Sequence, residues 1–180
     1  MATIREIAQL GNPVLRRKAS RVSDLTSPAL QALVDDMFVT VQAANGAGIA
    51  APQVSVSERL FIVCSKPSPR YPYAPDMEPE VLLNPVIERY SEETDKDWEG
   101  CLSIPGIRAM VPRSSSIDVS WETLDGEKME QTYDGFLARV FQHETDHLDG
   151  IVYLDRVEDN ADIVTEQEFI RQLAQHGAEQ

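Results

Sequence analysis

The chain has little cysteine and few basic residues for its length. Two cysteines are too few for a disulfide framework, which favours a reducing compartment. No apolar run approaches the roughly 20 residues that a membrane helix needs, and the first ten residues lack the apolar core of a signal peptide. We therefore expect a cytoplasmic protein of bacterial type with no membrane contact, while an organelle is not excluded.

Positive charge is also scarce. Sixteen lysines and arginines stand against thirty aspartates and glutamates, which gives a net charge of −14. This balance repels phosphate backbones, so we do not expect direct binding to nucleic acid.

The apolar pattern predicts one α+β domain over residues 1–180, since helices and antiparallel strands alternate irregularly. Ser27-Pro28 is typical of a helix start, and Asp125-Gly126 of a hairpin turn. The acidic segment from about residue 158 to 180 is expected to be a loosely attached helix or tail. The expected helices are 28–45, 136–148 and 163–175, and the expected strands are 60–64, 81–90 with a break at Asn84-Pro85, 117–121 and 127–133.

Two histidines, His143 and His147, lie four residues apart in the segment Gln-His-Glu-Thr-Asp-His at 142–147. On an α-helix this spacing puts both imidazoles on one face, one turn apart, where they can bind one metal ion. Glu144 then lies beside the open position of the metal, where water is activated. The arrangement is that of hydrolytic metalloenzymes.

A catalytic site of this kind needs a third protein ligand. One protease pattern takes it from a histidine at a position where this chain has Tyr153. Another pattern takes it from a later glutamate, which leaves Glu166 or Glu168 open. Cys101 is the stronger candidate, because it has polar neighbours in a glycine-containing loop that reads Glu-Gly-Cys-Leu-Ser.

A glycine-containing segment, Gly-Ala-Gly-Ile-Ala-Ala-Pro-Gln, occupies residues 46–53. It imitates a dinucleotide-binding turn, but such a turn follows a strand and opens a helix. Here a helix precedes the glycines and Pro52 follows them. The glycines more plausibly let the backbone approach a substrate closely, with Gln53 offering an amide donor.

Together, these three segments resemble the motifs of the peptide deformylases. The motifs Gly-x-Gly-x-Ala-Ala-Pro-Gln, Glu-Gly-Cys-Leu-Ser and Gln-His-Glu-x-Asp-His-Leu stand here in order at 46–53, 99–103 and 142–148. The similarity extends more loosely from about Ile4 to about Leu154. It implies an α+β fold with antiparallel or mixed sheets packed around a central helix that carries the histidine pair. It also implies a metal-dependent hydrolase that removes the formyl group from formyl-methionyl peptides of newly made proteins and releases formate.

The resemblance assigns a role to each matching residue. Glu144 is implied as the group that takes and returns the proton. The side-chain amide of Gln53 and the backbone N–H of Leu102 are implied as the donors that hold the developing oxyanion. The implied metal ligands are Cys101, His143 and His147. The implied substrate-binding residues are Gly48, Ile49, Gly100, Phe136 and Val140.

The resemblance also implies Fe(II) as the native metal, although a Cys-His-His set suits Zn, Ni or Co as well. The expected partners are formyl-methionyl peptides and nascent chains. Some family members reach the ribosome through a basic C-terminal helix. Residues 156–180 of this chain contain two arginines and six acids, so we do not expect that docking here.

Several interpretations stay open at this level. Ile49, Phe136 and Val140 are equally compatible with an ordinary buried core. Arg139 and Asp97 lie where some relatives have apolar residues, which predicts a more polar pocket rim. Gln142 and Asp146 either orient a ligand or only cap and solvate the helix. A protease built on the same histidine pair, and a structural metal clamp with a fourth ligand, are the two competing functions.

Overall fold

The computed structural model describes residues 1–68 and 71–177. The helices are α1 (Pro28–Ala43), α2 (Gly135–Leu148) and α3 (Glu166–Gly177). The strands are β1 (Gly48–Ala50), β2 (Leu60–Val63), β3 (Glu80–Tyr90), β4 (Thr94–Cys101), β5 (Ile104–Ser114), β6 (Ser116–Glu122), β7 (Lys128–Asp134) and β8 (Ile163–Thr165).

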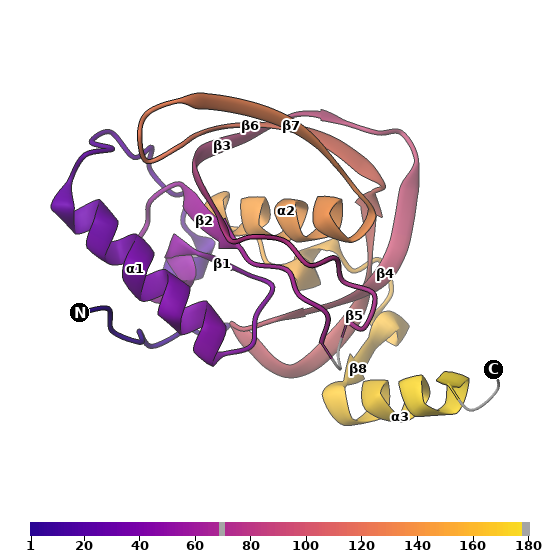
Figure 1. Cartoon of the computed structure of the whole chain (residues 1–180). Helices are drawn as coiled ribbons and strands as arrows, with labels where there is room; N and C mark the ends of the chain where they lie inside the picture. Colours follow the sequence, from indigo (N-terminus) through magenta and orange to yellow (C-terminus); the bar gives the residue numbers. More distant parts are fainter. Residues whose placement is uncertain (69–70, 178–180) are drawn as a thin grey trace.

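Two antiparallel sheets enclose the second helix. One sheet has the strand order β1-β2-β3-β6-β7 and the other the order β4-β5-β8. Figure 1 shows α2 lying inside, with β3, β6 and β7 arching over it and the β4–β5 hairpin to its right and below it. Every residue from Ala138 to Leu148 is buried. The expected α+β class, with sheets around a central helix, is confirmed.

Strand β2 explains how the core is divided. Phe61 and Val63 point into a cluster of buried residues that includes Phe141 of α2. Leu60 and Ile62 point the other way, into a second cluster with the buried side of α1. A strand covered on both faces needs a continuous apolar run, and the sequence of β2 provides it.

The first helix follows its sequence signals. The Ser27 hydroxyl accepts a hydrogen bond from the backbone N–H of Ala29 at 3.2 Å, with proline at the first helical position. The helix ends at Ala43, and Asn45 then turns the chain with a φ of 52°. The predicted hairpin turn is also present, since Gly126 has a φ of 79° between β6 and β7.

The extended segment at 81–90 is not broken at Asn84-Pro85 as expected. Strand β3 continues through it with an irregular register between Leu83 and Val86. Asn84 has a φ of 52°, and its side chain compensates by bonding the backbone N–H and carbonyl of Val22 and the carboxylate of Glu122. An asparagine tolerates this left-handed conformation better than most residues.

The C-terminal prediction is wrong in two respects. Residues 163–165 form strand β8, which pairs with β5, and the helix begins only at Glu166. The segment is not loosely attached, because Phe169 is 3% exposed and its ring lies 5.3 Å from that of Trp98. The part of the expected tail at 178–180 lies outside the described residues. None of the described helices is long and apolar enough to cross a membrane.

Candidate active site

The helix α2 and the end of β4 bring the three predicted metal ligands together. Cys101 Sγ, one ring nitrogen of His143 and one ring nitrogen of His147 all lie within 4.8 Å of one another. Cys101 Sγ is 3.3 Å from His147 Nε2. The sequence predicts Cys101 in a loop, but it is the last residue of β4 and pairs with Ile104 across a tight turn. The turn therefore holds the thiol rigidly against the helix.

The donor set fits a catalytic metal. His143 Nδ1 lies 2.8 Å from the carboxylate of Glu99, which leaves its Nε2 free to bind a metal. Within residues 1–68 and 71–177, this is the sole cluster of cysteine, histidine and acidic side chains with metal-ligand spacing, and it has three members. Three protein ligands with one open position characterise catalytic sites, whereas structural zinc sites have four.

The cysteine carries negative charge readily. Burial alone raises the pKa of Cys101, but the positive charge of His147 and hydrogen bonds from both histidines lower it to about 5. A thiolate is the form of cysteine that binds metals. The other cysteine, Cys64, is buried at the end of β2, and burial raises its pKa to about 11.

Glu144 lies between the two histidines in the sequence of α2, and one of its carboxylate oxygens makes no hydrogen bond within the described residues. It is 4% exposed, and its Oε2 is among the few buried side-chain atoms in the described residues that have no hydrogen-bond partner. Burial raises the pKa of Glu144 to about 7. A carboxyl group of this kind can both take and return a proton near neutral pH.

Gln53 approaches the site from a short 3-10 helix, Ala51–Val54, directly after β1. Its Oε1 accepts a hydrogen bond from the backbone N–H of Ala50 at 2.9 Å, which fixes the orientation of the amide. Its Nε2 then lies 3.2 Å from Ser103 Oγ and 3.5 Å from Cys101 Sγ. The donor side of the amide is thereby directed toward the proposed metal ligands.

A cavity of about 220 Å³ opens beside these residues. Gln53 and Glu144 line this cavity. So do five more of the predicted catalytic and substrate-binding residues: Gly48, Gly100, Leu102, Phe136 and Val140. The structure does not bring Ile49 into it. Successive side chains of β1 point to opposite faces, so Ile49 is fully buried in the cluster on the α1 side.

A family model for polypeptide deformylases matches residues 4–162. The chain belongs to the polypeptide deformylase family. Peptide deformylase 2 of a Nostoc species is 53% identical over 163 residues, which cover 91% of each chain. A class I type b peptide deformylase from Acinetobacter baumannii has a TM-score of 0.85 at 43% identity, covering 87% of this chain and 100% of that one. The Thermotoga maritima deformylase has a TM-score of 0.77 at 35% identity, covering 87% of this chain and 99% of that one.

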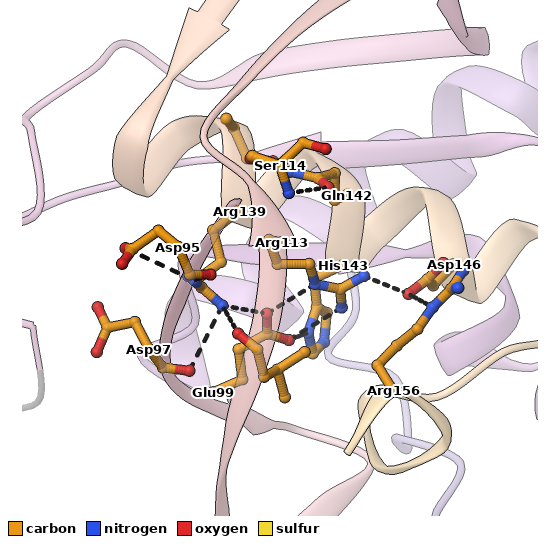
Figure 2. A network of polar contacts seen from close by, with 12 residues as sticks. Asp95, Asp97, Glu99, Arg113, Ser114, Arg139, Gln142, His143, Asp146 and Arg156 are labelled. Atoms are coloured by element: carbon orange, nitrogen blue, oxygen red, sulfur yellow. Dashed lines mark hydrogen bonds and ion pairs between the residues drawn. The ribbon is translucent and has the colours of Figure 1, made fainter. Parts of the chain in front are cut away.

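This deformylase also contains a buried ionic network that the sequence did not predict (Figure 2). Arg113 bonds Glu99 with two nitrogens, at 2.8 and 3.1 Å, and reaches Asp146 with a third at 2.6 Å. Arg156 bonds the same aspartate at 2.7 Å. Burial alone raises the pKa of Glu99, but His143 and Arg113 lower it well below its usual range. Glu99 therefore faces His143 as an anion.

The structure also decides how Gln142 and Asp146 are used. Neither solvates the helix, because both are buried. Gln142 accepts from the backbone N–H of Ser114 and donates to its carbonyl, at 3.1 and 2.9 Å. The expected polar rim is found only in part: Arg139 lies in the cavity wall but is buried and directs its guanidinium to Glu99 and to strand carbonyls, and Asp97 is exposed and is not part of the lining. Long-range pairing of this kind leaves no local pattern in the sequence.

The mouth of the cavity contains a second cluster without a sequence signal. Arg108 donates to the hydroxyl of Tyr71 at 2.6 Å and to Glu166 at 3.0 Å. Tyr71 also packs its ring 5.2 Å from that of Phe136. Glu166 is thus engaged with Arg108 and is not a member of the three-residue metal cluster, and neither is Glu168. The protease pattern with a glutamate ligand does not match this geometry.

Proposed function

We propose that the protein is a metal-dependent peptide deformylase that removes the formyl group from formyl-methionyl peptides, and that Cys101, His143 and His147 would hold its metal ion. The observation that carries the assignment is the combination of three convergent donors with a buried, unpartnered Glu144 oxygen at a cavity. The Acinetobacter baumannii deformylase has been crystallised with Met-Ala-Ser, a peptide with an unblocked methionine. A peptide of that kind is the expected product here.

The metal makes water acidic enough to act as a nucleophile near neutral pH and polarises the formyl carbonyl. Fe(II) is our proposal for the native metal, because the family resemblance implies it; the donor set itself also suits Zn, Ni or Co. An iron site with a thiolate ligand is oxygen-sensitive. Protein purified in air should therefore lose activity, while nickel-loaded protein keeps it.

Glu144 moves the proton. Its carboxylate takes a proton from the attacking water and returns it to the amine nitrogen as the C–N bond breaks, because an unprotonated amide anion is a poor leaving group. The raised pKa of Glu144, about 7, suits both halves of this transfer. The products are formate and a peptide with a free N-terminal amine.

Leu102 and Gln53 stabilise the charge that develops on the formyl oxygen. The backbone N–H of Leu102 follows the cysteine ligand directly, and the amide of Gln53 is already oriented by Ala50. One such fixed donor is typically worth about 3–4 kcal/mol of the activation barrier.

Substrate binding uses the open edge of β1, which pairs with β2 on its other side only. We propose that the backbone around Gly48 pairs with the peptide as an added strand and that Gly100, which lines the same cavity, also binds it. Phe136 and Val140 line the cavity beside His143 and form the pocket for the methionine side chain. Ile49 contributes at most its backbone, because its side chain lies in the core.

A single catalytic domain acting in a bacterial-type cytoplasm is part of the same proposal, since the relatives come from bacteria. Nascent chains are its substrates. The acidic C-terminal segment offers no basic helix for docking on the ribosome or on nucleic acid.

The decisive experiment is formate release from formyl-Met-Ala-Ser by anaerobically purified protein of known metal content. Acetyl-Met-Ala-Ser is the control and should release no acetate. Cys101→Ala should lose both metal and activity, whereas Glu144→Gln should keep the metal and lose about 10²–10⁴-fold in rate. No formate from fully metallated protein, or full activity of Glu144→Gln, would contradict the proposal.

A further inference from the structure

Arg139 lies on α2 one turn before His143, and its guanidinium is buried and hydrogen-bonded to other protein groups. Its side chain is 7% exposed. Nη1 donates to Glu99 Oε1 at 3.0 Å and to the carbonyl of Val111 at 2.7 Å, and Nη2 donates to the carbonyl of Asp95 at 2.8 Å. One side chain therefore joins the helix of the two histidines to both strands of the β4–β5 hairpin (Figure 2).

Glu99 is the shared partner. Each of its oxygens accepts two hydrogen bonds: Oε1 from Arg113 Nε and Arg139 Nη1, and Oε2 from Arg113 Nη2 and His143 Nδ1. A carboxylate with four donors in fixed directions cannot rotate. The orientation of the His143 ring follows from it, because a hydrogen bond to the second ring nitrogen sets both tautomer and ring direction.

We propose that Arg139 is a positioning residue for the metal site, acting on His143 through Glu99 and on Cys101 through the β4–β5 hairpin. The inference rests on the proposed function, since it takes His143 and Cys101 as metal ligands. Arg113 already supplies the charge that buried Glu99 requires. The contribution of Arg139 is thus geometric: it closes the fourth direction around the carboxylate and fixes the distance between helix and hairpin.

If Arg139 only stabilised the fold, its removal would lower stability without a specific effect on the metal. A positioning role has a different consequence. Without Arg139, Glu99 keeps Arg113 and His143, so no buried charge is left alone and the fold should persist. His143 would then gain freedom, and the metal would be released faster. Loss of a group that orients a metal ligand typically costs about 10- to 100-fold in metal affinity.

The test compares Arg139→Met with wild type and with Arg108→Met. Arg108 is the matched control, because its side chain is 5% exposed and lines the same cavity but makes no hydrogen bond to Glu99. Three readouts are taken: the dissociation rate of Co(II) into a chelator, the visible absorption of the Co(II) protein, and the thermal unfolding of the metal-free protein. We expect Arg139→Met to release Co(II) at least about tenfold faster with shifted absorption bands, and Arg108→Met to match wild type in both.

Arg139→Lys provides the second variant. A lysine ammonium keeps the charge and can donate to Glu99, but it lacks the planar fork that reaches two carbonyls as well, so its release rate should lie between wild type and Arg139→Met. Wild-type release rates in Arg139→Met, or equal acceleration in Arg108→Met, would overturn the inference. If Arg139→Met did not fold, a wild-type Co(II) release rate in Arg139→Lys would overturn the inference. Failure of both variants to fold would overturn it as well.

The proposed function is tested separately in the same series. If wild-type protein bound no Co(II) or released no formate, the function itself would fail. If wild type passed both tests and Arg139→Met behaved like it, only the positioning role would fail.

Discussion

Replacing Gly48 by alanine tests whether Glu144 must occupy its observed position. A Cβ built on Gly48 would lie 2.6 Å from Glu144 Oε1 and 3.0 Å from its Cδ. The carboxylate would have to retreat by about 0.8 Å to restore the ordinary contact distance of 3.4 Å. Glu144 lines the cavity of about 220 Å³, so the carboxylate can make this shift, but only by leaving its observed position beside the two histidines.

The expected cost follows from that displacement. A misplacement of about 1 Å in a reacting group can cost roughly 100-fold in rate, which corresponds to about 2.7 kcal/mol of transition-state stabilisation. Glu144 is not among the three proposed metal donors, so the metal content should not change. We therefore expect Gly48→Ala to bind metal stoichiometrically and to deformylate formyl-Met-Ala-Ser about 100-fold more slowly in kcat/KM.

A double-mutant cycle separates this cause from a clash with substrate. If the added methyl group acts by displacing Glu144, it should matter little once the carboxylate has been replaced, and Gly48→Ala with Glu144→Gln should be no more than about threefold slower than Glu144→Gln alone. Losses that multiply would show that alanine blocks the bound peptide backbone instead. Full activity of Gly48→Ala would refute the geometric argument altogether.

Three further predictions concern the remainder of the chain. In metal-free protein at pH 7, Cys101 should react with iodoacetamide about 100-fold or more faster than Cys64, because the pKa of Cys101 is lowered to about 5 and that of Cys64 is raised to about 11. Bound metal should protect Cys101. Equal reaction rates measured by mass spectrometry would contradict this prediction. Asn84→Ala should lose about 3 kcal/mol through three hydrogen bonds, two of them buried and one half-buried, lowering Tm by roughly 6–12 °C, and Asn84→Gly should recover part because glycine accepts the φ of 52°. Phe169→Ala should speed amide exchange in α3 while α2 stays protected; unchanged exchange in α3 would show that Phe169 does not anchor it.

Local signals in the sequence predicted much of the fold. The cap at Ser27-Pro28 and the apolar period of α1 are properties of neighbouring residues, and so is the continuous apolar run of β2. The β4 strand was missed because Thr94–Cys101 is mostly exposed and shows no alternation of apolar and polar residues. It pairs with β5 in a hairpin across Leu102-Ser103, and this turn lacks the Asn-Gly or Asp-Gly signal that marks many hairpins in a sequence.

Errors at the C-terminus and in β1 have simpler causes. Residues 163–165 are Ile-Val-Thr, β-branched residues that favour a strand, but the helical period of the following residues was extended over them. The resemblance implies a pocket role for Ile49, while the sequence alone is equally compatible with a place in the core. In a strand, a shift of one position changes the face, and only the pairing of β1 with β2 shows which face meets the cavity.

Motif residues were predictable, whereas their supports were not, and the burial of α2 explains why. A helix buried along eleven consecutive residues can satisfy its polar side chains only inside the protein. Arg139, Gln142 and Asp146 do so by bonding strands β4 and β5 or Arg113, partners that lie far away in sequence. Their bonds hold the helix against the β4–β5 hairpin, whose first strand ends in Cys101. Glu144, Thr145 and His147 each keep one buried side-chain atom without such a bond, and among these Glu144 is the carboxylate, the group that can exchange a proton with a bound water rather than secure the fold.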